Sequence, residues 1–94
     1  MDLLTDFKAY LMTEKRASVN TIASYLRDVT QFLDYLDGES RQVLDVNRDA
    51  IETYMHRLID RGKSAATVTR ALASLKCLYR WLQQIGQCDH NPTK

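Results

Sequence analysis

Glycine and proline are scarce in this chain, with three glycines and one proline among 94 residues. Alternating runs of β-branched residues are also missing, whereas long stretches repeat apolar side chains with the 3.6-residue period of a helix. Few helix-breaking residues together with this period favour an all-α fold. A chain of this length has the size of one small domain, so a second domain does not fit within it.

Long hydrophobic runs and metal-ligand motifs are missing as well. No apolar stretch approaches the roughly 18 residues of a membrane span, and Asp2, Asp6 and Lys8 interrupt the N-terminus where a signal peptide would be apolar. We therefore expect a cytoplasmic protein with no membrane partner. Cys77 and Cys88 lack CxxC spacing, and with two histidines they complete no recognisable ligand set. The sequence favours reduced thiols and predicts neither a metal nor a cofactor.

Charge is divided unevenly along the chain, although the overall net charge is only +1. Residues 61–94 contain six basic residues and one acidic residue, a net charge of +5, which leaves −4 for residues 1–60. This asymmetry is compatible with an anionic partner for the basic part of the chain, but by itself it is weak evidence for one.

Capping residues divide the chain into four expected helices. Ser18, Asn47 and Ser64 suit helix N-caps, and Gly62 and Gly86 suit the ends of the helices before them. We therefore expect helices over residues 2–14, 18–36, 47–61 and 64–85, with Asp37-Gly38 stopping the second. Each has an apolar stripe that should face a shared core. For the first three these stripes are Leu3, Leu4, Phe7, Leu11; Ile22, Leu26, Val29, Leu33, Leu36; and Ile51, Tyr54, Met55, Leu58, Ile59.

The fourth expected helix differs between its two ends. Its first half has a core stripe, and on the opposite side Lys63, Thr67, Arg70 and Ser74 are separated by small alanines, which would leave the backbone approachable for a nucleic acid. A solvated helix surface would show the same pattern. The second half is apolar around most of its circumference and should be packed inside the protein. The residues concerned are Leu78, Tyr79, Trp81, Leu82 and Ile85.

The second and fourth expected helices repeat one another. A shift of 46 residues superposes Ser18 on Ser64 and Leu36 on Leu82, with similar pairs between them, which indicates two stacked helical hairpins. A partner of the fourth helix should then also meet the equivalent surface of the second. A helical wheel of the second helix places Asn20, Thr21, Ser24, Arg27 and Gln31 on that equivalent surface. These are also ordinary exposed helix residues.

Three segments together resemble one protein family. They are Ser64 to Leu82 followed by Gly86 and Asn91-Pro92; Ser18 to Asp28; and Ile51 to Met55 with Leu58. The chain is similar, in the right order and over nearly its whole length, to the N-terminal core-binding domain of Xer-type tyrosine recombinases and phage integrases. This resemblance implies a four-helix SAM-like bundle that forms one jaw of a clamp on duplex DNA, with a catalytic domain of the same chain as the other jaw. Its second and fourth helices would face the major groove of the recombination core site.

The resemblance also implies a set of DNA contacts and partners. The positions carried over are Asn20, Thr21, Ser24, Arg27, Lys63, Ser64, Thr67, Arg70 and Lys76, and Ser74 joins them from the polar face of the fourth helix. Residues 1–90 would form the core-binding domain and residues 91–94 the start of a linker. The expected partners are double-stranded DNA, the catalytic domain and other recombinase protomers in a synaptic complex.

No catalytic residue is expected in this chain. The H-x-x-R segment of the family's catalytic domain is missing, and the five tyrosines fall in amphipathic helices at or near apolar positions, which indicates core or boundary roles. We therefore expect the chain not to be an enzyme by itself, although its parent would be a recombinase.

Two other functions compete with DNA binding by a recombinase domain. A small helical module could use the same polar face to bind a protein. A helix-turn-helix regulator fits less well, because no short recognition helix follows a tight three-residue turn. Salt dependence separates DNA binding from protein binding, because phosphate contacts release counterions.

Overall fold

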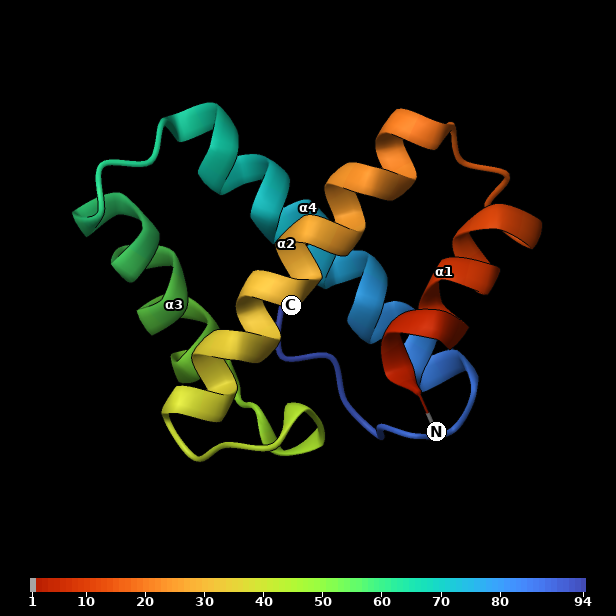
Figure 1. Ribbon diagram of the computed structural model, residues 1–94. Coiled ribbons are helices and arrows are strands. Elements are labelled where there is room, and N and C mark those ends of the chain that lie inside the picture. Colours follow the sequence, from red (N-terminus) through yellow and green to blue (C-terminus); the bar gives the residue numbers. More distant parts are fainter. Residues whose placement is uncertain (1) are drawn as a thin grey trace.

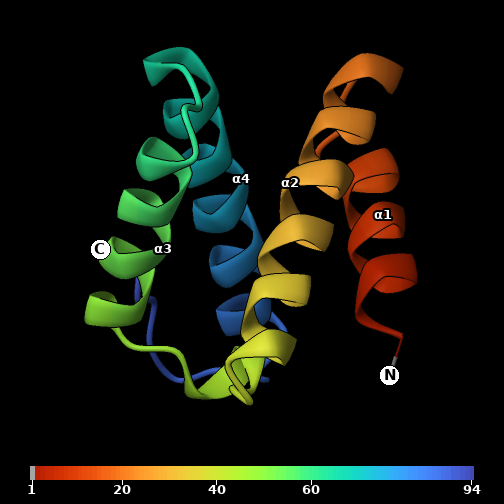
Figure 2. The same cartoon turned by 60° about the vertical axis from the view of Figure 1, so that its left-hand side comes forward.

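The computed structural model describes residues 2–94 and contains four α-helices. They are α1 (Leu3–Thr13), α2 (Val19–Gly38), α3 (Arg48–Asp60) and α4 (Ala65–Gln84), with one 3₁₀ turn, η1 (Val43–Asp45), between α2 and α3. Within the described residues there is no strand, which confirms the all-α class. The helices form two hairpins, and Figure 2 shows the order α3, α4, α2, α1 across the bundle. The two long helices, α2 and α4, cross each other near their middles (Figure 1).

Side-chain caps begin the helices where the sequence predicts them. The Oγ atoms of Ser18 and Ser64 accept the backbone N–H groups of Thr21 and Thr67, each at 3.1 Å, and Asn47 caps α3 in the same way at 2.9 Å. Each cap satisfies one backbone donor that the first helical turn leaves without a partner. The predicted helix starts are therefore confirmed.

The predicted end of α2 is wrong by two residues. Gly38 is the last residue of the helix rather than its stop, and the chain turns at Ser40, whose φ is +56°. The backbone N–H of Arg41 then donates to the carbonyl of Leu36 at 2.8 Å, which closes the helix and keeps Leu36 inward. Here this closing bond ends the helix, and the glycine does not.

Trp81 and Tyr79 anchor the second half of α4 in the core. Trp81 is only 5% exposed, and its ring centroid lies 5.4 Å from that of Phe7 and 5.9 Å from that of Tyr10, both on α1. The predicted burial of Trp81 is confirmed, and its aromatic neighbours belong to the first helix. Tyr79 is fully buried and donates its hydroxyl to the carbonyl of Val43 at 2.7 Å, which ties η1 to the bundle.

Two isoleucines that the sequence places in the core are exposed. Ile59 is 54% exposed, because Leu58 takes the inward position near the end of α3 and the next residue points about 100° away. Ile85 is 43% exposed, because α4 ends at Gln84 and Ile85 follows it as the C-cap. In the loop before α3, Val46 is buried, whereas Leu44 lies at the surface.

The segment after α4 returns to the bundle. His90 lies with Nε2 at 2.9 Å from the carbonyl oxygen of Val46 and Nδ1 at 2.9 Å from Oδ1 of Asp89. Both partners are acceptors, so this arrangement favours the imidazolium, in which both ring nitrogens donate. The hydrogen bond to Asp89, and next the one to Val46, raise the pKa of His90 above its ordinary value.

Among the described helices, none combines the length and apolar character that crossing a membrane requires.

Candidate nucleic-acid interface

A buried carboxylate lies where α2 and α4 cross. Asp28 on α2 is 3% exposed and accepts two hydrogen bonds from Arg70 on α4, one from Nε at 3.1 Å and one from Nη2 at 3.0 Å. The Ser74 hydroxyl donates a third at 2.8 Å. A buried charge is tolerated only when it is paired and hydrogen-bonded, and this one is both. The three residues therefore form a satisfied polar cluster in the middle of the helix crossing.

Arg70 is the member of this cluster that reaches solvent. Its side chain is 40% exposed, and the hydrogen bonds to Asp28 raise the pKa of its guanidinium. The planar guanidinium has two outward edges with paired donors. One edge, Nε with Nη2, is occupied by Asp28, so the other edge, Nη1 with Nη2, remains for a partner.

Ser74 lies differently from its predicted position on the exposed polar face. It is 0% exposed, and besides Asp28 its hydroxyl contacts the carbonyl of Arg70 at 3.1 Å. Ser74 is about 40° around the helix from Arg70, and that rotation turns it toward α2. Asp28 is absent from the site residues predicted from the sequence. The signal that could have found it is the repeat, because Asp28 and Ser74 are separated by the same 46 residues as the caps Ser18 and Ser64.

The other predicted contact residues are accessible to different degrees. Asn20, Arg27, Lys63, Ser64 and Lys76 are exposed, whereas Thr21, Ser24 and Thr67 are partly buried. At each of the two helix starts, two hydroxyl groups are hydrogen-bonded to each other: Ser18 to Thr21 at 2.9 Å, and Ser64 to Thr67 at 3.0 Å. Figure 1 shows that the first halves of α2 and α4 diverge from the crossing toward the same side of the molecule.

The predicted lysines do not gather around Arg70. Lys76 lines a hollow of about 290 Å³ between the α1–α2 turn and α4, together with Lys15, Arg80 and Thr21. Lys63 lines a separate hollow of about 530 Å³ between α2 and α3. The structure therefore divides the predicted set into a central arginine and two lateral basic positions.

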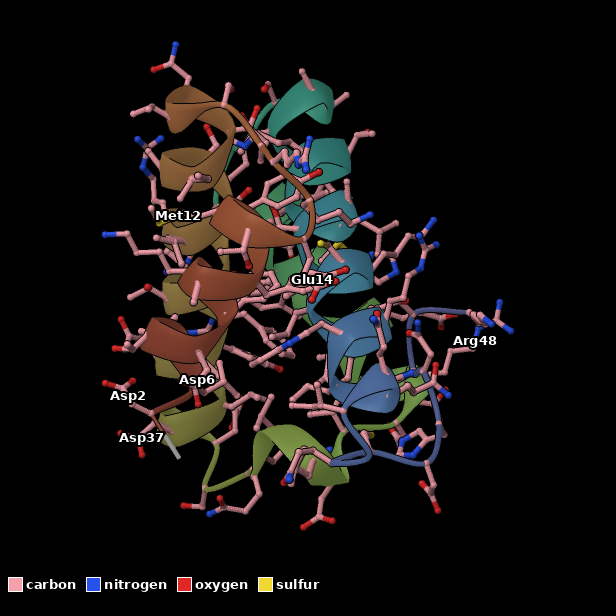
Figure 3. All side chains as sticks on the ribbon, turned by 90° about the vertical axis from the view of Figure 1, so that its right-hand side faces the viewer. Asp2, Asp6, Met12, Glu14, Asp37 and Arg48 are labelled. Atoms are coloured by element: carbon pink, nitrogen blue, oxygen red, sulfur yellow. The ribbon has the colours of Figure 1, made fainter. Side chains whose placement is uncertain are left out.

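Charge differs between the two ends of the molecule. The turns before α2 and α4 carry Lys15 and Arg16 on one side and Arg61 and Lys63 on the other, and all four are exposed; Glu14 and Asp60 are the acidic residues beside them. Figure 3 shows Asp2, Asp6 and Asp37 in the lower part of the molecule, away from the starts of the two long helices. The side toward which α2 and α4 diverge is thus the more basic one.

The tyrosines are placed as core or boundary residues, as the sequence predicts. Tyr54 and Tyr79 are buried, and Tyr10, Tyr25 and Tyr35 are partly buried. Burial raises the pKa of Tyr54 to about 12 and that of Tyr79 still further.

One group of potential metal ligands is present near the C-terminus. Ligand atoms of Cys88, Asp89 and His90 lie within 4.8 Å of one another. Both ring nitrogens of His90 are already hydrogen-bonded, and the Cys88 thiol donates to the His90 carbonyl at 3.1 Å. A metal would have to displace at least one of these hydrogen bonds to reach the histidine.

These features describe a helical domain with a polar helix crossing and one more basic side, and sequence comparison identifies its family. The family model described as "Phage integrase, N-terminal SAM-like domain" matches residues 4–86, so the chain belongs to this family. The predicted resemblance and SAM-like fold are therefore confirmed.

Relatives include the tyrosine recombinase XerD of Listeria innocua, 37% identical over 94 residues covering 97% of this chain and 31% of the relative. The tyrosine recombinases XerC of Pediococcus pentosaceus and of Roseiflexus are each 33% identical, covering 98% and 99% of this chain and 31% and 30% of the relatives. The chain thus spans about a third of the length of the curated relatives it matches. No solved structure matches the chain.

Proposed function

We propose that this chain binds duplex DNA through the first halves of α2 and α4, as the N-terminal part of a tyrosine recombinase that rearranges DNA at specific sites. The observation that carries the proposal is the placement of Arg70. Its guanidinium is held at the helix crossing, is partly exposed, and lies between two polar helix halves that diverge to the same side. Arginine is the side chain that most often reads guanine in the major groove. Membership of the integrase family supports the same function.

The basic residues on either side of Arg70 are suited to phosphate contacts. The basic turns flank the starts of α2 and α4, whose free backbone N–H groups add positive potential on that side. We retain Lys63 and Lys76 as phosphate contacts on either side of Arg70, while Ser74 leaves the set because it is buried. The remaining proposed contacts are Asn20, Thr21, Ser24, Arg27, Ser64 and Thr67.

We infer that DNA cleavage requires a part of the recombinase other than this chain. The described tyrosines are core or boundary residues, and two of them have strongly raised pKa values. The further partners would be the catalytic domain and other protomers in a synaptic complex, and the site of action would be the cytoplasm. The segment from Asn91 would begin the linker to the catalytic domain.

Binding measured against salt tests the function. The chain is titrated in low and moderate salt onto two duplexes: one enriched from a library with a randomised core, and a shuffled duplex of the same composition. Arg70→Ala should lose about 1–3 kcal/mol on the enriched duplex and less on the shuffled one. Lys63→Ala should weaken binding to both duplexes alike and reduce the salt slope by about 1. Lys8→Ala is the control, because Lys8 is exposed on α1, and it should change neither.

Protein binding without DNA is the competing function, and the same titration decides between them. Equal binding by wild type and every variant, or no binding at low salt, would remove the DNA-reading role from α2 and α4. The polar faces of the two helices would then be assigned to a protein partner.

A further inference from the structure

Asp28 is almost completely buried and cannot reach DNA itself, yet it holds the residue that is proposed to do so. Three donors converge on its carboxylate, two from Arg70 and one from Ser74. Among the described residues, no buried side-chain nitrogen or oxygen lacks a hydrogen-bond partner, so the carboxylate is fully satisfied inside the protein. Its effect on a ligand must therefore pass through Arg70.

We propose that Asp28 is a positioning residue for base recognition, which sets the edge of Arg70 that is presented to DNA. This inference rests on the proposed DNA-binding function. Two hydrogen bonds to one planar group fix both its direction and its rotation, whereas a single bond would leave the rotation free. The Nη1–Nη2 edge then points away from the carboxylate. That edge can donate two parallel hydrogen bonds to O6 and N7 of a guanine.

The net charge of the Asp28–Arg70 pair distinguishes its role in base recognition from a general attraction for DNA. Asp28 and Arg70 together carry no net charge, so the pair adds little to the general attraction of the surface for phosphates. Arg70 should therefore contribute mainly to discrimination between base sequences. The exposed Lys63, which has no ion-pair partner among the described residues, should contribute mainly to general affinity.

Asp28→Asn distinguishes a positioning role from a purely structural one. The substitution keeps the size of the side chain, removes one negative charge and replaces one acceptor with a donor, so it breaks the paired hydrogen bonds to the guanidinium. Binding to the shuffled duplex should stay equal or become tighter, with a salt slope steeper by about 1. The preference for the enriched duplex should fall by roughly 5- to 150-fold, the range of one bidentate base contact. A structural defect would instead weaken binding to both duplexes together.

The experiment selects duplexes from the randomised library with wild type, Asp28→Asn, Arg70→Lys and Ser74→Ala, and circular dichroism checks the fold of each variant. Wild type should enrich a guanine at one position, and Asp28→Asn and Arg70→Lys should both lose it, because lysine has no second edge. Ser74→Ala is the matched control. It removes a bond to the same carboxylate but leaves the Arg70 pair intact, so the guanine should be kept.

The outcomes separate failure of the inference from failure of the function. If wild type enriches no sequence, the proposed DNA-binding function fails, and the role of Asp28 fails with it. If wild type enriches a sequence and a folded Asp28→Asn keeps the guanine, only the positioning role is refuted. Should Asp28→Asn fail to fold, Asp28→Glu decides, because it keeps the charge but moves the carboxylate by one methylene group: retention of the guanine would overturn the inference, and its loss at that one position would support it.

Discussion

The two helical hairpins, α1–α2 and α3–α4, have the same backbone plan displaced by 46 residues. Ser18 and Ser64 cap the long helices with nearly identical backbone angles, φ −66° and ψ 160° against φ −68° and ψ 158°. The bonds that close these helices also correspond: Arg41 N–H donates to Leu36 at 2.8 Å, and Gln87 N–H donates to Leu82 at 2.9 Å. The repeat indicated by the sequence is therefore a repeat of geometry as well as of residue types.

The same geometry is built from different residues in the two hairpins. The left-handed turn positions are occupied by Arg16 and Ser40 in the first hairpin, with φ of +49° and +56°, and by Gly62 and Gly86 in the second, with φ of +83° and +77°. Glycine adopts this conformation without the steric cost that other residues incur. The caps and closing bonds thus impose the turns even where the residue is unfavourable.

The crossing of α2 and α4 lies at equivalent positions of the two hairpins. Asp28 and Ser74 are related by the repeat, and they touch each other. Contact between a position and its own equivalent is expected where two related units meet on a local two-fold axis. The hairpins differ at this point, because one supplies the charge and the other a hydroxyl.

The largest expected difference between the hairpins concerns one aromatic position. Trp81 is buried against α1, whereas its equivalent, Tyr35, is partly buried, lies against Tyr54 with the two rings tilted by 45°, and sits beneath the Arg57 guanidinium. Trp81→Ala should lower the free energy of unfolding by about 3–5 kcal/mol, as for large buried aromatics. Tyr35→Ala should cost clearly less. Chemical denaturation of both variants measures the difference. Equal losses of unfolding free energy would show that the two aromatic side chains contribute equally to the core.

The helix caps should show the hairpins to be alike. Ser18→Ala and Ser64→Ala each remove one bond to a backbone N–H at 3.1 Å, so each should cost about 1 kcal/mol. Thermal unfolding of the two single variants and of the double variant provides the measurement. The two effects should match, and a much larger loss for one serine would mean that its hydroxyl has a structural role beyond capping.

Exchanging the turn residues should have opposite effects on the two hairpins. Arg16→Gly should stabilise the first hairpin by up to about 1 kcal/mol, because glycine relieves the left-handed strain. Gly62→Ala should destabilise the second by roughly 1–2 kcal/mol. A Cβ at position 62 would meet no atom within 4 Å, so this cost arises from the backbone alone. A rise in melting temperature for Arg16→Gly and a fall for Gly62→Ala are expected, and changes of the same sign would contradict this explanation.

Much of this fold could be predicted because its signals are local. Caps at Ser18, Asn47 and Ser64 and the apolar stripes act within one helix, and the repeat follows from comparing two helices. The burial of Ser74 could not be predicted in the same way. A helical wheel shows the direction of a side chain from its own axis, but not where another helix passes.

The candidate site was predicted less completely, because contacts between helices cannot be read from a single helix. The sequence indicates that Arg70 and the polar residues of α2 belong to one surface, and the structure adds the buried acid between them. Lys76 is separated from Arg70 because six residues along α4 turn it about 120° around the helix. It then shares a hollow with Arg80 of the same helix and with Lys15, which the packing of the α1–α2 turn on α4 brings there. Whether these residues contact DNA stays a prediction.

His90 attaches the C-terminal segment to the bundle, and this attachment makes the stability of the fold depend on pH. Its pKa is higher in the folded chain than the ordinary value of 6.5, chiefly because of Asp89 and then Val46. A raised folded-state pKa means that the folded chain holds this proton more tightly than the unfolded chain does. The resulting stabilisation is fully present below about pH 6.5 and is lost as the pH rises through the raised value. The stability difference between wild type and His90→Gln should accordingly shrink from acidic to alkaline pH, so the attachment of this segment loosens as the solution becomes basic.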